Sequence, residues 1–210
     1  MRLFDIQKPY HAIYSLGDLC TVSIQLERNG LRPYAGPLDW MASYSLPDVI
    51  RLLGNRFAGF MDYDHLVVEK QVSDKLYLVK ETYYNVYSNH DFFTHNNTSQ
   101  HLAAYPEVKA KYDRRVQRFL EKAQTSPSNL FIRTGGTFAE LEALRGVLAQ
   151  LVAHSFDILL VNHTSVQGIV EEACPVENCC SIQLPDGEVL RGNDHLWEKV
   201  LSGIRLVEEA

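Results

Sequence analysis

The sequence predicts an α/β fold in which helices flank a mostly parallel, Rossmann-like, doubly wound sheet. Apolar runs such as residues 156–161 suit strands covered on both faces. Strand-like runs alternate with helical patterns towards both ends of the chain, which is typical of β-α-β units. From His65 to Phe93 a two-residue period predicts an antiparallel hairpin, inserted with its loops at about residues 65–104.

The first predicted unit is a strand at residues 11–16, closed by Gly17, and a helix capped by Asp18. This helix ends at the Asn29-Gly30 pair. A proline-bearing loop leads to a second helix, for which Ser45 is the expected N-cap and Gly54 the stop.

The middle of the chain holds the hairpin, which turns at Ser73-Asp74, and a helix from Pro106 to Gln124. The C-terminal part begins with a strand at residues 130–133, and Thr137 with Glu140 forms a capping box for the next helix. Strands at 156–161 and 181–184 and a helix at about 194–207 follow. We expect one domain over residues 1–210.

Composition limits the function. The 210 residues carry 20 Lys plus Arg and 26 Asp plus Glu, a net charge of −6 that argues against a nucleic-acid partner. No apolar run reaches the roughly 18 residues of a membrane span, and the N-terminus lacks the apolar core of a signal peptide. The four cysteines have no zinc-binding spacing. We expect a cytoplasmic protein with reduced thiols and without metal or cofactor; its oligomeric state stays open.

Ligands of open α/β sheets bind beyond the carboxyl ends of the strands. Three predicted strand ends carry polar groups, at residues 17–20, 133–136 and 162–164. Cys20 stands out because it lies near the second residue of a predicted helix, where the free N–H groups and the dipole lower a thiol pKa, although Asp18 opposes this effect. The competing interpretation is a buried, unreactive cysteine.

A cysteine nucleophile needs a base and a group that orients the base. His90 is the leading candidate base, and His163 is the rival because it ends a predicted parallel strand. In an extended segment His90 and Asp91 point to opposite faces, so Asp39 is the better orienting residue.

Anion binding is the second kind of chemistry that the sequence indicates. Arg114, Arg115 and Arg118 lie within one turn of the basic helix, and the Gly135-Gly136 turn precedes a capped helix. The candidate ligand-binding residues are Asp18, Trp40, Arg114, Arg115, Arg118, Arg133, Gly135, Gly136 and Asn162.

With SLGDLC, the PLDW loop, NHDFF, YDRRVQRF and LFIRT in that order, the chain resembles a bacterial family of unknown function catalogued as papain-like cysteine peptidases. The resemblance implies Cys20 as the nucleophile and His90 as the base, with Asp39 or Asp91 as a third member. It also implies the alternative fold, a papain-like α+β arrangement.

The leading hypothesis is therefore a cysteine-dependent hydrolase or acyl transferase, acting on a peptide or small-molecule substrate. An alternative is a transferase or binding domain for a nucleotide sugar or phosphate ligand, which would use the strand-end cleft and the basic helix. A second alternative is a non-catalytic interaction protein that uses exposed tyrosines.

Overall fold

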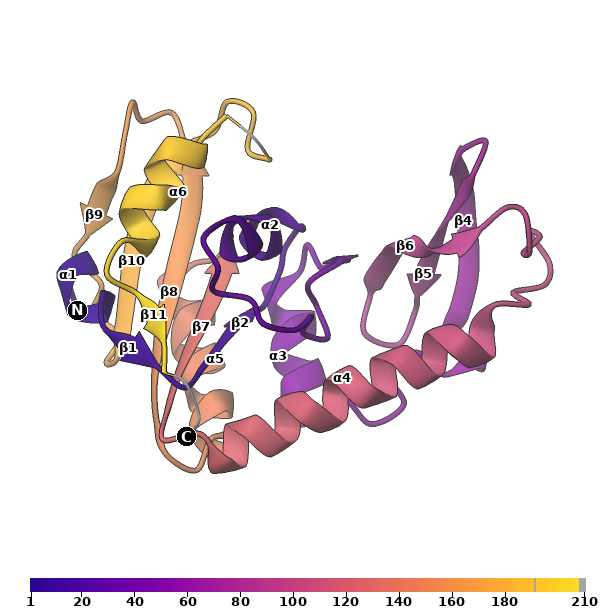
Figure 1. The fold of residues 1–210 in the computed structure, drawn as a ribbon, viewed down its shortest axis with the longest axis horizontal. Helices are drawn as coiled ribbons and strands as arrows, with labels where there is room; N and C mark the ends of the chain where they lie inside the picture. The colour runs from indigo at the N-terminus through magenta and orange to yellow at the C-terminus, as the bar shows by residue number, and fades with distance from the viewer. Residues whose placement is uncertain (191, 208–210) are drawn as a thin grey trace.

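The largest sheet has five strands in the computed structural model, which describes residues 1–190 and 192–207. This sheet, called the central sheet below, lies on the left in Figure 1. Its strand order is β2-β7-β8-β10-β9. The strands are β2 (Ala12–Ser15), β7 (Ser128–Thr134), β8 (Ser155–Thr164), β10 (Cys179–Pro185) and β9 (Val170–Glu172). Neighbours are parallel except for β9, which is antiparallel to β10. The predicted mixed α/β fold with a mostly parallel sheet is confirmed.

Two smaller sheets accompany the central one. A four-stranded antiparallel sheet has the order β3-β6-β5-β4, and β1 pairs in parallel with β11. The bounds are β1 (Pro9–Tyr10), β3 (Met41–Ala42), β4 (Leu66–Ser73), β5 (Leu76–Glu81), β6 (Val86–Phe93) and β11 (Arg205–Leu206). The predicted hairpin is therefore a three-stranded meander joined by β3. Its second turn, which the sequence analysis missed, contains Asn85 at a φ of 54°.

Helices cover both faces of the central sheet. Their bounds are α1 (Leu3–Ile6), α2 (Thr21–Arg28), α3 (Leu46–Gly54), α4 (Tyr105–Thr125), α5 (Phe138–Leu151) and α6 (Asp194–Leu201), with a 3-10 turn, η1, at Tyr63–His65. One apolar cluster joins α3, α4 and α5 to the sheet and also includes side chains of β5 and β6. The other joins α1, α2 and α6 to the opposite face.

Strand β8 shows why this sheet is central. Ile158 and Leu160 belong to the first cluster, and Leu159 and Val161 belong to the second, so both faces of the strand are buried. The described parallel strands follow one another in chain order, without the reversal of a doubly wound sheet. Neither the Rossmann-like nor the papain-like detail is thereby confirmed, and the single-domain organisation stays a prediction.

Of the three predicted helix N-caps, two are confirmed. The Ser45 side chain accepts a hydrogen bond from the Asp48 N–H (3.3 Å), and Thr137 and Glu140 form the expected capping box. The prediction that Asp18 caps α2 is wrong, because the helix begins at Thr21 with Cys20 at the N-cap position. The last predicted helix ends earlier, at Leu201, and β11 follows it.

A buried carboxylate ties the antiparallel sheet to α4. Asp91 of β6 is only 7% exposed and accepts hydrogen bonds from Ser88, Lys111 and the Tyr112 hydroxyl, the last at 2.8 Å. Burial alone would raise the pKa of Asp91, but these hydrogen bonds and the Lys111 charge hold it below its usual range. The ionised form therefore stabilises the contact between β6 and α4.

We predict that Asp91→Asn lowers the free energy of unfolding by about 2–3 kcal/mol, because it leaves the Lys111 ammonium without its carboxylate. The exposed ion pair of Lys109 with Asp113 supplies the control, since Asp113→Asn should cost less than about 1 kcal/mol. Chemical denaturation at pH 7 measures both. Equal losses in the two variants would contradict this account.

The same group makes stability depend on acidity. Because the pKa of Asp91 is lower in the folded chain than the roughly 3.9 of an unfolded aspartate, its contribution is present above that value. It is lost as the pH falls further, through the folded-state pKa. Denaturation between pH 5 and 2 should show a shallower acid loss in Asp91→Asn than in the unchanged protein.

Candidate functional site

The three polar strand ends lie at one edge of the central sheet, as the sequence predicted. The Thr134 hydroxyl at the end of β7 lies within hydrogen-bond distance, 3.1 Å, of both the Gly17 carbonyl and the Asp18 carboxylate. Near the end of β8, the Asn162 side chain accepts a hydrogen bond from the Gly136 N–H at 3.1 Å and donates one to the Gly136 carbonyl. The carboxyl ends of β2, β7 and β8 are therefore held together.

Arg133 is the buried centre of this edge, with an exposure of 1%. Its guanidinium donates to the carbonyls of Leu16 (2.8 Å), Ser43 (2.7 Å) and Gly135 (3.3 Å), and to the Ser43 hydroxyl (3.0 Å). Burial lowers the pKa of Arg133 to about 10, against the opposing effect of Asp18 and Glu140. Most of its N–H groups donate to backbone carbonyls. Arg133 therefore stabilises the fold and has few donors left for a ligand.

Cys20 is a half-buried free thiol at the start of α2. Burial raises its pKa above the usual thiol range, and only the N–H of its own backbone opposes this shift. Desolvation is therefore a larger effect on the pKa of Cys20 than the lowering expected from the helix terminus. No charged side chain contributes to the shift.

His163 lies on the same sheet edge, at the end of β8. Burial lowers the pKa of His163, and the carboxylates of Asp18 and Asp186 oppose the shift. Its Nε2 atom is buried and has no hydrogen-bond partner within the described part of the chain. The imidazole is thus neutral at pH 7 and has a ring nitrogen available. The His163 Nε2 atom therefore makes no hydrogen bond to the Cys20 sulfur in this structure.

His90 lies on β6, exposed to solvent, and meets the Trp40 ring edge-on at 5.5 Å between ring centroids. Its neighbour Asp91 is buried, although the regular alternation of β6 is interrupted here, because Asn89 is exposed like His90 and Phe92 is buried like Asp91. Buried Asp39 accepts hydrogen bonds from Arg32 (3.2 Å) and from the Gly36 N–H (2.9 Å). Among the described residues, the bonds of Asp39 and Asp91 go elsewhere than to His90, so the third catalytic member stays a prediction.

The arginines on the basic face of α4 lie in two different environments. Arg118 lies over the Tyr34 ring, 4.7 Å from its centroid. Arg114 and Arg115 instead line cavities that also contain His90 and Lys111. The sequence analysis missed Lys111 and Ser43, because only the fold shows that the first binds Asp91 and the second binds Arg133.

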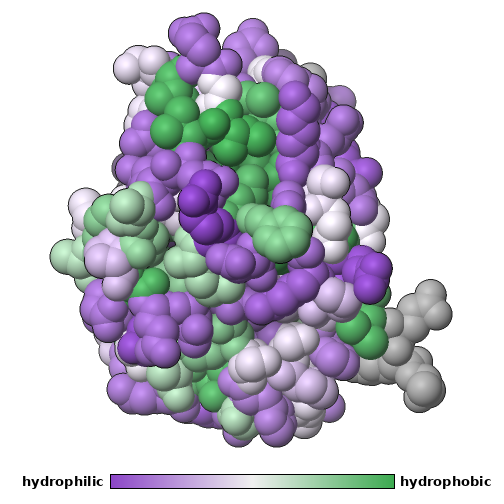
Figure 2. All heavy atoms as spheres, turned by 90° about the vertical axis from the view of Figure 1, so that its left-hand side faces the viewer, coloured by the Kyte–Doolittle hydropathy of each residue, from purple (hydrophilic) through white to green (hydrophobic). Residues whose placement is uncertain are grey.

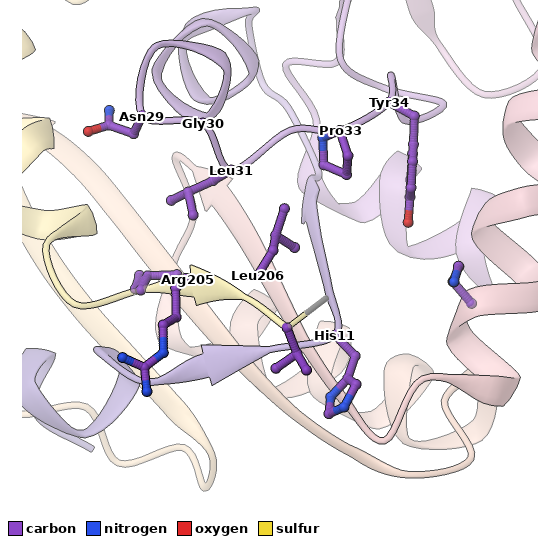
Figure 3. A pocket seen from close by; sticks show the side chains of 11 residues that line it. His11, Asn29, Gly30, Leu31, Pro33, Tyr34, Arg205 and Leu206 are labelled. Atoms are coloured by element: carbon purple, nitrogen blue, oxygen red, sulfur yellow. The ribbon is translucent and has the colours of Figure 1, made fainter. Parts of the chain in front are cut away.

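A cavity of about 590 Å³, shown in Figure 3, does not have Cys20 among its lining residues. His11, Leu31, Tyr34 and Leu206 are among its lining residues. His11 precedes β2, whereas Cys20 follows the carboxyl end of that strand. Within the described residues no cluster of three metal-ligating side chains occurs, and no helix is long and apolar enough to cross a membrane.

Comparison with known proteins gives a family and one distant relative. Residues 11–166 match the family described as "Putative papain-like cysteine peptidase (DUF1796)". An uncharacterized protein of Acanthamoeba polyphaga mimivirus is 28% identical over 133 residues, which are 57% of this chain and 59% of the relative. The chain thus matches less than two thirds of that protein. This match gives no support to the expected bacterial origin. No solved structure matches the chain.

We predict that Gly17→Ala destabilises the strand-end edge strongly. Gly17 has a φ of 89°, and an added Cβ would lie 2.0 Å from the Ser43 hydroxyl oxygen and 2.8 Å from an Arg133 nitrogen. Backbone strain plus this overlap should cost about 2–5 kcal/mol. Gly30→Ala is the matched control, because Gly30 has a φ of 69° with no atom within 4 Å of the added Cβ. Thermal unfolding would contradict this account if both variants lost the same stability.

Proposed function

The chain belongs to the family described as papain-like cysteine peptidases, and we propose that it is a cysteine-dependent hydrolase with Cys20 as the nucleophile. The position of Cys20 carries the proposal. It is a half-buried thiol at the first turn of α2, just beyond the carboxyl end of a parallel strand. Peptides are the substrates that the family description suggests. An acyl transferase would use the same cysteine thioester and pass the acyl group to an acceptor other than water.

The raised pKa of Cys20 determines how the reaction begins. At neutral pH the thiol keeps its proton, so a neutral histidine must take that proton as the sulfur attacks the carbonyl carbon. The first turn of α2 has backbone N–H groups without intrahelical partners, which can stabilise the resulting oxyanion. The histidine then returns the proton to the leaving group, and water hydrolyses the thioester. Reduced thiols fit the cytoplasmic location that we also propose.

Two histidines are candidates for the base, each for a different reason. His163 lies on the strand-end edge, is neutral at pH 7 and has a buried ring nitrogen without a partner. His90 is the base that the resemblance implies, and it contacts Trp40 of the PLDW loop. The proposal requires that a ring nitrogen of one of them reaches the Cys20 sulfur when substrate is bound, since catalytic hydrogen bonds often tighten only in the complex.

The alternative functions have weaker support. A nucleotide-sugar or phosphate site at the strand ends would need Arg133, whose donors bind backbone carbonyls instead. An interaction protein would use exposed aromatic side chains, of which Tyr44, Tyr63 and Tyr83 are 64%, 43% and 44% exposed. The face in Figure 2 is mostly hydrophilic with an apolar strip in its upper half, and nothing in it identifies a partner.

The central test is the pH dependence of Cys20 alkylation by iodoacetamide in the folded protein. Its rate should rise with pH and reach half-maximum above the roughly 8.5 of an ordinary cysteine, because only the thiolate reacts. Cys174→Ser removes the other half-buried thiol, and burial raises the pKa of Cys179 and Cys180 to about 12. A Cys20 that resists labelling at every pH would overturn the proposal.

Hydrolysis of a peptide library then identifies the base. We expect Cys20→Ser to abolish turnover, and removal of the true base to lower kcat by about 100-fold or more with a smaller effect on KM. His163→Gln and His90→Gln are compared with His154→Gln, an exposed histidine outside the site. Undiminished hydrolysis in Cys20→Ser would contradict the mechanism.

A further inference from the structure

We propose that the cavity between β6 and α4 is a binding site for a compact anionic group, a phosphoryl or carboxylate group of a ligand. Trp40, His90, Asp91, Lys111 and Arg115 line it, and its volume is about 300 Å³. It shares three of these residues with an adjoining cavity of about 460 Å³, at which Arg114 lies. The proposal does not rest on Cys20 as the nucleophile.

The first argument is an unused donor. The Nη1 atom of Arg115 is buried and has no hydrogen-bond partner within the described part of the chain. Buried polar groups in native proteins are almost always bonded, and guanidinium groups are suited to carboxylate and phosphate oxygens. An anion in the cavity would supply the acceptor that Arg115 lacks.

The second argument is that the neighbouring carboxylates are already engaged. Asp91 binds Lys111, Ser88 and Tyr112, so it leaves Arg115 without a direct partner. Asp39 attracts Arg115 through space, but its hydrogen bonds come from Arg32 and Gly36. The chain as a whole carries a charge of −6, so a cavity lined by both Lys111 and Arg115 is a local exception.

The third argument concerns the shape of the ligand group. The cations of Lys111 and Arg115 are held at 5.4 and 5.2 Å from the Tyr112 ring centroid, which fixes their positions in advance. The Arg32 guanidinium lies over the Trp40 ring at 5.0 Å, and His90 meets this ring edge-on. Arg32 and His90 thus already contact the Trp40 ring on which a flat nucleobase would stack. The cavity therefore favours a small anion.

The test is an anion titration of the whole chain at constant ionic strength, maintained with KCl. Inorganic phosphate, phosphoserine and succinate are the probes, and Trp40 fluorescence and the Tm are the readouts. We expect saturable binding of at least one probe with a rise in Tm, which chloride does not produce. Preference for phosphate and phosphoserine indicates a phosphoryl ligand, and preference for succinate a carboxylate. No saturable binding of any probe would overturn the proposal.

Variants then locate the binding. Arg115→Gln should weaken binding at least about tenfold, because it removes a charge-assisted hydrogen bond. Arg118→Gln is the matched control on the same helix, since Arg118 packs on Tyr34 outside the cavity, and it should change binding less than twofold. If Arg115→Gln lacks a native circular dichroism spectrum, Arg114→Gln replaces it. Equal effects of the arginine variants and Arg118→Gln would reject the site.

Cys20→Ser separates this proposal from the proposed hydrolase. The variant should bind the preferred anion as tightly as the unchanged chain does, because Cys20 does not line the cavity. Loss of hydrolysis with retained binding then supports both proposals independently. If Cys20→Ser weakened anion binding tenfold, the anion would be bound at the cysteine and the cavity would not be its site.

Discussion

The strand-end edge depends on one buried cation. Arg133 is a β7 residue, and its guanidinium binds carbonyls from the end of β2, from the loop after β3 and from the turn before α5. At a pKa of about 10 it stays charged at neutral pH, although within residues 1–190 and 192–207 no carboxylate forms an ion pair with it. Backbone dipoles solvate the charge instead, so the three segments must keep their carbonyls directed at one point. The missing side chain of Gly17 makes room for this arrangement.

This constraint explains the state of Cys20. The Gly17-Asp18 segment leads straight from the Arg133 cradle into α2, so the thiol is held against the sheet edge at half burial. Two physical effects then compete at the same sulfur. The helix terminus favours the thiolate, and desolvation favours the thiol. Desolvation is larger, and the thiol therefore keeps its proton at neutral pH.

The sequence predicted the elements whose signals are local. The apolar run of β8, the capping box at Thr137 and the N-cap at Ser45 all depend on residues within one turn or one strand. It could not predict β3, because a two-residue strand is defined only by its partner on β6. Nor could it predict the role of Arg133 or the direction of the Cys20 shift, because both follow from packing between segments far apart in the chain.

An irregularity in β6 links the anchor of the antiparallel sheet with the cationic cavity. The pairing of β5 with β6 shifts register here, so the buried side chains of Ser88 and Asp91 bond each other, whereas His90 between them is exposed. Asp91 in turn selects Lys111 from α4 as its partner, and this sets which turn of the helix lies beside β6. Arg115 lies one helical turn after Lys111 and lines the same cavity, but the Asp91 carboxylate already binds Lys111. A contact that stabilises the fold thus leaves a cation unpaired beside a histidine, which is a chemical environment that an anionic ligand completes.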